Sequence, residues 1–195
     1  MRLLEILRSI KTEISSLIKA FVVAYPDSYV GACLRKAYWS SYLNLDKSKF
    51  RRIGRGAVFD TKDTLVIGSN FVFGDNALLD NGDSFGCYIG NYVGIANGSY
   101  IRTGNHSMAD VTVPIIDQGH TAKSITYKDA CYSVVIEDDV WIGAFAIILS
   151  GAHIGEGSVV SAGSVISSYV PPYSIVAGNP ARVIANRKKI AEHKI

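Results

Sequence analysis

The sequence predicts an all-β solenoid, a coil of short stacked strands, that follows a helical N-terminal segment. The main observation is a six-residue rule that runs unbroken from Ile136 to Pro171. Each repeat opens on an aliphatic residue: Ile136, Ile142, Ile148, Ile154, Val160 and Ile166. Four positions later stands a small or β-branched residue: Val140, Ala146, Ala152, Ser158, Ser164 and Val170. Neither a helix nor a two-faced strand has this period, whereas a coil with short flat sides and inward aliphatic residues does.

The first fifty residues are of a different kind. The apolar residues Leu3, Leu7, Ile10, Ile14, Leu17 and Phe21 fall on one helical face, and this pattern stops near Pro26. A second helix is predicted from Val30 to Tyr42. Two interpretations of the first helix stay open. Its apolar face packs on an open end of the coil or on a neighbouring subunit, or it lies on the inner membrane face with Arg8, Lys11 and Lys19 toward anionic headgroups.

The remaining chain divides into a coil, an inserted loop and a basic tail. The six-residue period continues upstream with interruptions, so residues 51–181 are predicted to form the solenoid. Residues 102–135 carry no such period and should leave the coil as a long loop, which in a compact domain is usually functional. Residues 182–195 hold five basic side chains against Glu192 alone and should form a short C-terminal helix.

Composition excludes several classes of protein. A net charge of +3 is too small to indicate nucleic-acid binding. Cys33, Cys87 and Cys131 form no CxxC pair, so we expect buried thiols in a reducing compartment rather than a zinc site. Charged residues recur through the N-terminus, which argues against a signal peptide or a spanning segment. The expected location is the cytoplasm, with peripheral contact to the cytoplasmic membrane as an extension.

The segments "VWIGAFAIILSGAHIGEGSVVSAGSVI" and "VPPYSIVAGNPARVI" resemble the hexapeptide-repeat acyltransferases, in particular sugar O-acetyltransferases of the galactoside and maltose type. The resemblance covers about residues 51–184. It implies a left-handed parallel β-helix, acetyl-CoA as donor, and a homotrimer with sites between subunits. The implied reaction is O-acetylation of a sugar hydroxyl, as in cell-surface polysaccharide biosynthesis. Alternatives are N-acetylation of an amino sugar, acetylation of an antibiotic hydroxyl, a γ-carbonic-anhydrase-like enzyme, and a non-catalytic assembly module.

Acetyl transfer to a hydroxyl needs a general base, and histidine suits this role near neutral pH. His106 stands in "IRTGNHSMADVTVP", which resembles the segment that ends in the catalytic histidine of sugar acetyltransferases, so we predict His106 as the base. His120 lies in the same loop with nothing recognisable around it, while His153 occupies an outward repeat position and His193 a charged tail. Asp110 or Asp117 could orient the His106 ring. The alternative is that both are solvated loop carboxylates.

Acceptor binding is predicted at three positions. Asn76 lies thirty residues before His106, the approximate interval at which the galactoside and maltose enzymes place an acceptor-binding asparagine. A turn asparagine without that role is the alternative. Asp80, like Asp83, is a carboxylate that could bind sugar hydroxyls or stay solvated. Trp141 in "DDVWIGA" occupies an outward position, where the resemblance implies contact with cofactor or acceptor, and trimer packing is the alternative.

Cofactor binding is predicted along small outward residues and at the basic tail. The small residues Gly143, Ala144, Ser161, Ala162 and Gly163 would leave a groove for a pantetheine arm. Arg182, within "AGNPAR", is the best-placed partner for the phosphates of coenzyme A, and Lys188 is a second candidate. We expect no metal, because the intervals between His106, His120 and His153 do not match the closely spaced histidines of a zinc site.

Overall fold

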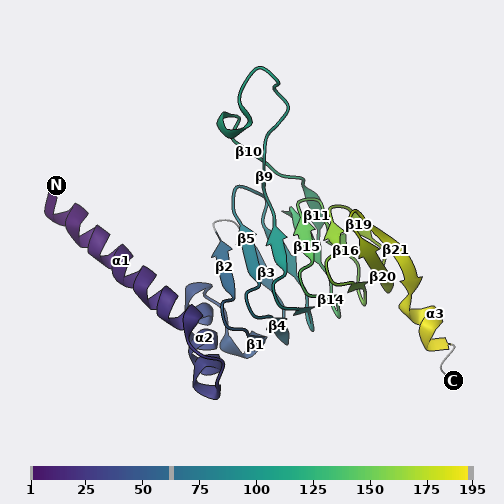
Figure 1. Cartoon of the computed structure of the whole chain (residues 1–195), viewed down its shortest axis with the longest axis horizontal. Coiled ribbons are helices and arrows are strands. Elements are labelled where there is room, and N and C mark those ends of the chain that lie inside the picture. Colours follow the sequence, from purple (N-terminus) through teal and green to yellow (C-terminus); the bar gives the residue numbers. More distant parts are fainter. Residues whose placement is uncertain (1, 62–63, 193–195) are drawn as a thin grey trace.

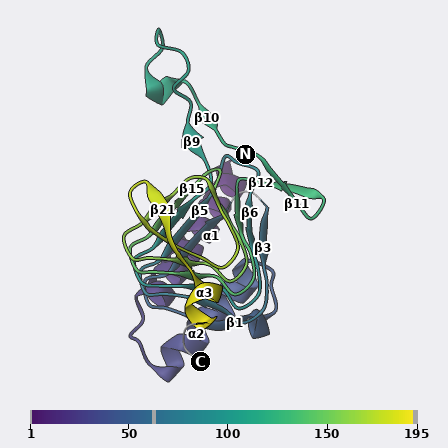
Figure 2. The same ribbon diagram turned by 90° about the vertical axis from the view of Figure 1, so that its right-hand side faces the viewer.

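The structure is a computed structural model that describes residues 2–61 and 64–192, with side chains from residue 5 onward. Its body is a coil of parallel strands, seen from the side in Figure 1 and nearly along its axis in Figure 2. Two helices precede the coil, α1 (Arg2–Ala24) and α2 (Tyr29–Tyr42), with a short 3₁₀ turn η1 (Lys47–Lys49) after them. The chain ends, as far as it is described, in helix α3 (Arg187–Glu192).

Successive strands of the coil visit three sheets in rotation over the described residues. The first sheet pairs β1 (Phe50–Ile53), β4 (Phe71–Phe73), β7 (Gly94–Ile95), β14 (Trp141–Ile142), β17 (Val159–Val160), β20 (Ser174–Gly178) and β21 (Ala181–Asn186). The second pairs β2 (Val58–Thr61), β5 (Leu78–Asn81), β8 (Tyr100–Arg102), β15 (Ile147–Leu149) and β18 (Val165–Ile166). The third pairs β3 (Leu65–Ile67), β6 (Cys87–Ile89), β13 (Val134–Ile136), β16 (His153–Ile154) and β19 (Tyr169–Val170). All these pairs are parallel except β20 with β21.

The six-residue rule fills the interior of the coil, as predicted. The aliphatic residues that open the repeats from Ile136 to Ile166 are at most 2 % exposed, and the small residues from Val140 to Val170 at most 4 %. Equivalent positions stack directly, for example Ile89 on Ile136 and Ile136 on Ile154. Each coil therefore buries its aliphatic side chains against those of the next, and the mostly β prediction is confirmed.

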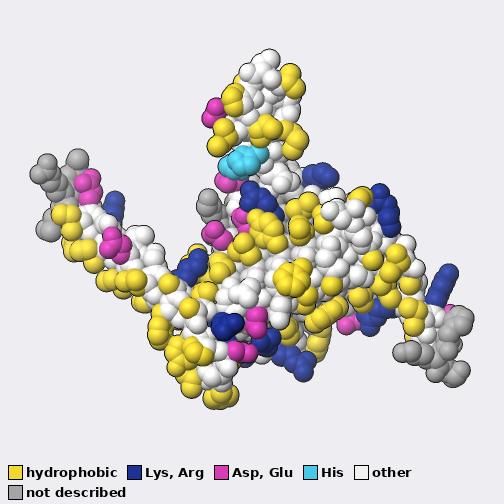
Figure 3. All heavy atoms as spheres, in the orientation of Figure 1, with side chains coloured by type: hydrophobic (Ala, Val, Ile, Leu, Met, Phe, Trp, Pro, Cys, Tyr) yellow, Lys and Arg dark blue, Asp and Glu magenta, His cyan; other side chains and the backbone are white. Residues whose placement is uncertain are grey.

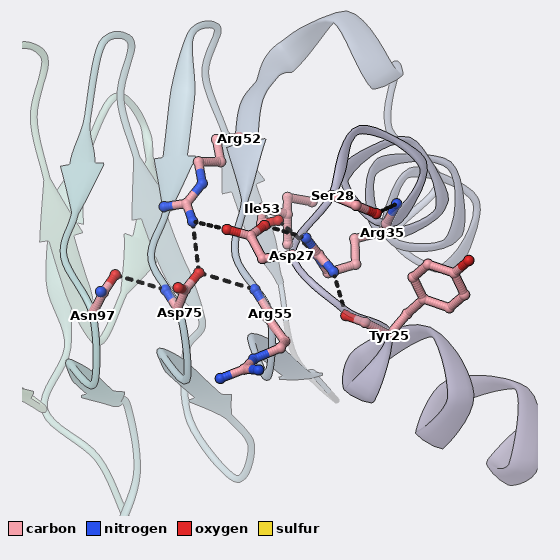
Figure 4. Close-up of polar contacts among 10 residues, drawn as sticks. Tyr25, Asp27, Ser28, Arg35, Arg52, Ile53, Arg55, Asp75 and Asn97 are labelled. Carbon is pink, nitrogen blue, oxygen red and sulfur yellow. Dashed lines mark hydrogen bonds and ion pairs between the residues drawn. The ribbon is translucent and has the colours of Figure 1, made fainter.

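A buried arginine fixes the helical segment on the first coil. Arg35 is 0 % exposed, and its guanidinium donates to the carbonyl oxygens of Ile53 (3.0 Å) and Tyr25 (2.9 Å) and to the Asp27 carboxylate (3.0 Å). Figure 4 shows the continuation of this network, in which Arg52 bridges Asp27 and Asp75. A buried guanidinium is tolerated only when its donors are satisfied, so these contacts specify how α2 sits on β1.

Helix α1 leaves the coil and projects from its end (Figure 1). Only its last turns touch the body: Val22 is 6 % exposed, and the Val23 carbonyl accepts from the Gly56 N–H at 2.9 Å. The apolar side chains on one face of α1 are nevertheless 47 to 70 % exposed: Ile6, Leu7, Ile10, Ile14, Leu17, Ile18 and Phe21. The interpretation that this face packs on the coil is therefore wrong, because the helix axis carries it away from the first coil.

The inserted segment contains more structure than one loop. Strands β9 (Asn105–His106) and β10 (His120–Thr121) form the neck of an arm, residues 105–121, whose loop contains the 3₁₀ turn η2 (Ile115–Asp117). A hairpin of β11 (Ile125–Tyr127) and β12 (Ala130–Tyr132) follows, and the coil resumes at β13. Figure 2 shows the arm and the hairpin leaving the same side of the coil.

Two expectations need correction. The basic C-terminal helix begins at Arg187 rather than Arg182, because Ala181–Asn186 folds back as β21 and covers the edge of β20. Of the cysteines only Cys87 is buried, and burial raises the pKa of its thiol; Cys33 and Cys131 are exposed. Within the described ranges, no helix combines the length and the apolar composition that crossing a bilayer requires.

Candidate active site

His106 lies at the neck of the arm, exposed to solvent. The β9–β10 register places it opposite His120, so both side chains leave the same face of the ribbon. Their ring centroids are 4.6 Å apart with an interplanar angle of 34°. Figure 3 shows histidine side chains at the base of the arm, where it meets the coil. The predicted base is thus accessible to an incoming molecule.

His120 lies close to the coil, a contact that its sequence surroundings did not indicate. Its Nδ1 lies 3.6 Å from Oδ2 of Asp83, in the corner that follows β5. The backbone at Gly104 passes so close to this corner that an added Cβ would lie 2.6 Å from the Gly82 carbonyl oxygen. Glycine at position 104 thus allows the arm to leave the coil beside Asp83.

The candidates for orienting His106 are placed elsewhere. Asp110 accepts hydrogen bonds from the Thr112 hydroxyl (2.6 Å) and N–H (2.8 Å), which lower the pKa of its carboxyl. Among the described residues, neither Asp110 nor Asp117 has a hydrogen bond or an ion pair with His106. The Asp110 carboxylate closes a local turn of the arm instead.

Asp80 lies next to the neck but is paired. Its Oδ2 accepts from the Tyr100 hydroxyl at 3.0 Å and from the Arg102 guanidinium, and its carbonyl accepts from Thr103 N–H at 3.1 Å. Partial burial and the contact with Asp80 raise the pKa of Tyr100 against the opposing effect of Arg102. An acceptor would have to share Asp80 with these donors.

Asn76 stands at a different corner of the coil from His106. Asn76 precedes the four-residue strand β5, whereas Asp83, which lies near His120, follows it. At the usual rise per residue, Asn76 and Asp83 are about 13 Å or more apart. Asn76 is exposed with φ of 54°, and its N–H donates to the Arg55 carbonyl at 2.8 Å. Within one chain the structure therefore does not bring Asn76 to His106, and a left-handed corner residue is what its geometry shows.

Trp141 lies half exposed on the outer face of the first sheet, between two hollows. One has a volume of about 390 Å³ and is lined by Arg51, Asn70, Tyr92, Asp139 and Arg187 among others. The second, of about 280 Å³, is lined by Arg52, Asn97 and Ala144 among others. The predicted indole thus has concave surface on both sides, as a ligand contact requires.

The predicted small residues gather at the corner after Trp141. A Cβ on Gly143 would lie 2.6 Å from the Ala162 nitrogen, and the Gly163 N–H donates to the Ala144 carbonyl at 2.8 Å. Trp141 and Gly143 donate their N–H groups to Ser158 (3.0 Å) and Val160 (2.8 Å) of the next coil. The Ala144 N–H has no such partner among the described residues and is the candidate oxyanion donor here.

The basic residues of the tail separate. Arg182 in β21 lines a hollow of about 210 Å³ at the coil end, away from Trp141, and donates to its neighbour's carbonyl oxygen at 2.9 Å. Lys188 lies 3.9 Å over the Tyr173 ring. Arg187, which the sequence did not single out, lines the larger hollow beside Trp141 and donates to Asp139 (3.0 Å) and the Gly157 carbonyl (2.6 Å). The position of Arg187 depends on the reversal of the chain at β21, which the sequence around Arg187 does not predict.

His153 is outward, as predicted, but has a structural role. Its Nε2 is 2.7 Å from Oε1 of Glu137, and its ring packs between Tyr127 (5.5 Å) and Tyr169 (5.2 Å). Within the described residues no group of three or more His, Cys, Asp or Glu side chains could hold a metal ion.

Eight of the candidate residues form two separate groups. His106, His120, Asp83 and Asp80 gather at the corner between the second and third sheets, where the arm leaves. Trp141, Gly143, Ala144 and Ala162 lie on the first sheet and the corner that follows it. One chain does not bring the candidate base to the candidate cofactor surface.

Comparison with known proteins identifies the repeats. The family model "Bacterial transferase hexapeptide (six repeats)" matches residues 133–168. Residues 133–168 therefore carry bacterial transferase hexapeptide repeats. It is 33 % identical over 141 residues to "Probable acetyltransferase Rv3034c" of Mycobacterium tuberculosis (strain ATCC 25618 / H37Rv), a match that covers 70 % of this chain and 44 % of that protein. The chain therefore spans less than half the length of this relative.

Solved structures share the fold of this hexapeptide-repeat chain. AntD, an N-acyltransferase from Bacillus cereus in complex with dTDP-4-amino-4,6-dideoxyglucose and coenzyme A, is similar with a TM-score of 0.55 and 23 % identity, covering 76 % of this chain and 80 % of that one. A maltose O-acetyltransferase from Clostridium difficile 630 gives a TM-score of 0.52 and 23 % identity, with coverage of 89 % and 84 %. At this identity the likeness shows a common architecture, and the resemblance seen in the sequence is confirmed.

Proposed function

We propose that the protein is an acetyltransferase that moves the acetyl group of acetyl-CoA to a sugar hydroxyl, with His106 as general base. The observation that carries the proposal is an exposed histidine at the neck of an arm on a coil of transferase hexapeptide repeats. The coil would be left-handed, as the resemblance implies; the unbroken six-residue period and the likeness to solved acetyltransferases support this.

The mechanism is direct transfer. A ring nitrogen of His106 takes the hydroxyl proton as the acceptor oxygen attacks the thioester carbonyl, so a C–O bond forms. The tetrahedral oxyanion would accept a hydrogen bond from Ala144 N–H. Collapse breaks the C–S bond, and the thiolate of coenzyme A receives the proton from His106. This scheme needs neither a covalent enzyme intermediate nor a metal ion.

The cofactor would lie beside Trp141. The indole and the small residues Gly143, Ala144 and Ala162 would line the pantetheine arm, and the hollows on either side of Trp141 leave room for it. Arg182, at the coil end, is proposed to bind a phosphate of the adenosine end. Because Lys188 lies over Tyr173, we give it a secondary part in this contact.

A homotrimer would complete the site. His106 and Trp141 lie on different sides of one coil, so a neighbouring chain has to supply the second group. The arm ends in exposed apolar side chains, among them Met108 (70 %), Val111 (96 %) and Ile116 (79 %), which suits a segment covered by another subunit. We place the arm of one subunit across the Trp141 face of the next.

The acceptor is proposed to be a glycan or its precursor in cell-surface polysaccharide synthesis, at the cytoplasmic side of the membrane. Asp80 and Asn76 are its candidate contacts. The two residues need not come from the same subunit of the trimer. N-acetylation of an amino sugar is the second candidate, because AntD, named an N-acyltransferase, shares the fold and holds an amino-sugar nucleotide. Mild base separates the two products, since it cleaves an acetyl ester and leaves an acetamide.

Helix α1 is proposed to lie on an anionic membrane surface. Its exposed apolar residues form one broad stripe, and Arg8, Lys11 and Lys19 lie along the polar side and one border of that stripe. Figure 3 shows the apolar stripe along the projecting helix. Arg8 and Lys11 match anionic headgroups, each contributing about 1 kcal/mol near such a surface. The Lys19 ammonium lies 5.7 Å over the Trp39 ring in this structure, so it would reach headgroups only after leaving that contact.

The test of the proposed reaction is thiol release from acetyl-CoA with a panel of sugars. His106→Ala should lower turnover by about 10² to 10⁴ while acetyl-CoA binding persists. The matched control is His153→Gln, which changes a histidine held by Glu137 outside both groups of site residues. Activity of His106→Ala within a few-fold of the unchanged protein would remove the assignment.

A further inference from the structure

The His106 ring has one described neighbour that could hold its orientation. It is exposed on a short two-stranded ribbon, and among the described residues its recorded side-chain contact is the ring of His120 at 4.6 Å. A base on such a ribbon would otherwise sample several rotamers. Productive proton transfer needs a defined orientation toward the acceptor hydroxyl, because misplacement by about 1 Å can cost 10²-fold in rate.

The His120 ring is in turn tied to the coil. Its Nδ1 faces Oδ2 of Asp83 at 3.6 Å, and Asp83 belongs to the corner against which Gly104 packs. The backbone supports the same arrangement, because Ser107 N–H donates to the Gly119 carbonyl at 3.0 Å across the neck. A line of contacts therefore runs from the rigid coil through Asp83 and His120 to His106.

We propose that His120 is a positioning residue, which holds the His106 ring by packing against it and is itself held by Asp83. This inference rests on the proposed function of His106 and adds two residues to it. The inference gives His120 no proton exchange with the substrate, because its Nδ1 lies 3.6 Å from Asp83 and its ring lies beside that of His106. Asp110, a carboxylate on the same arm, is not part of this line of contacts because it accepts hydrogen bonds from Thr112.

The test compares single and double variants in the thiol-release assay. His120→Ala and Asp83→Ala should each lower kcat by about 10-fold and leave the KM for acetyl-CoA within two-fold. The kcat of the double variant should be no lower than that of His120→Ala alone, because both changes break the same line of contacts. Asp83→Asn keeps an acceptor oxygen and should restore most of kcat. Asp110→Asn is the matched control and should be neutral.

Three results would overturn the inference. One is a kcat of His120→Ala within two-fold of the unchanged protein. Another is full additivity in the double variant, and the third is a loss in His120→Ala as large as in His106→Ala, which would make His120 the base. Since the side chains of His120 and Asp83 are 39 % and 47 % exposed, we expect unchanged thermal unfolding of their variants, which circular dichroism checks. An active His106→Ala would instead refute the proposed function itself.

Discussion

The indole of Trp141 lies over the backbone of Gly94, the residue that pairs with it in the neighbouring strand. A Cβ built on Gly94 would be 2.6 Å from Cε3 and 2.8 Å from Cζ3 of the indole. Position 94 therefore has to lack a side chain for the indole to lie flat between its two hollows.

Gly94→Ala should displace the indole and weaken acetyl-CoA binding. We expect the KM for acetyl-CoA to rise by about 10-fold, with little change in KM for the acceptor, because a contact of 1 to 1.5 kcal/mol is lost. Steady-state kinetics with each substrate varied in turn measures this. An unchanged KM for acetyl-CoA in a folded variant would show that Trp141 does not contact the cofactor.

Arg182→Ala should raise the KM for acetyl-CoA by about 10-fold, since a charge-assisted phosphate contact is worth about 1.5 to 3 kcal/mol. If the partner is the 3′-phosphate, the variant should no longer discriminate acetyl-CoA from its dephospho form. Arg187→Ala is the comparison, because Arg187 braces Gly157 and Asp139 and its loss should lower the melting temperature. Persistent discrimination by Arg182→Ala, with a lower melting temperature, would make Arg182 a structural residue.

Asp138 should stabilise the coil in a pH-dependent way. Burial acts to raise the pKa of its carboxyl, but hydrogen bonds from the Asn91 side chain (3.0 Å) and N–H (2.8 Å) outweigh it and lower the pKa. A lowered folded-state pKa gives stability that is present above the unfolded value of about 3.9 and is lost as pH falls through the folded value. The carboxylate therefore stabilises at neutral pH and not in strong acid.

Urea unfolding of Asp138→Asn tests this. The variant should be less stable than the unchanged protein at pH 7, because its amide places a donor against the Asn91 amide, and the difference should shrink toward pH 3. Asp117→Asn, an exposed change on the arm, should show no difference at either pH. If the difference in unfolding free energy between Asp138→Asn and the unchanged protein does not vary with pH, the stabilising role of the Asp138 carboxylate is contradicted.

The coil interior could be predicted from sequence because its cause is local. Once the strands stack, an aliphatic residue at every sixth position points into the coil, and the repeat-opening residues from Ile136 to Ile166 are all buried there. The arm neck could not be predicted, since the approach of His120 to His106 and Asp83 depends on pairing across the insertion, which carries no period. The position of Arg187 was equally hidden, because it depends on the long-range reversal of β21.

Helix α1 should bind vesicles that contain anionic lipid and not vesicles of phosphatidylcholine alone. Replacing Ile10 and Ile14 by glutamine should abolish flotation with anionic vesicles, because both side chains are about half exposed on the apolar stripe. The matched control, Ser9→Gln with Ser16→Gln, changes the polar face and should still float. Light scattering completes the test: a smaller assembly for the isoleucine variant would place a second copy of α1, and not a membrane, on this face.

The central claim is that the arm of one subunit and the Trp141 face of another form each site, and subunit mixing tests it most directly. His106→Ala and Trp141→Ala are each assayed alone, then co-refolded in equal amounts and assayed again for thiol release. A working site takes its arm from the tryptophan variant and its cofactor face from the histidine variant, so random assembly predicts about a quarter of the unchanged activity. If mixed oligomers form and remain as inactive as the separate variants, the two groups belong to one chain or to no common site, and the claim is contradicted.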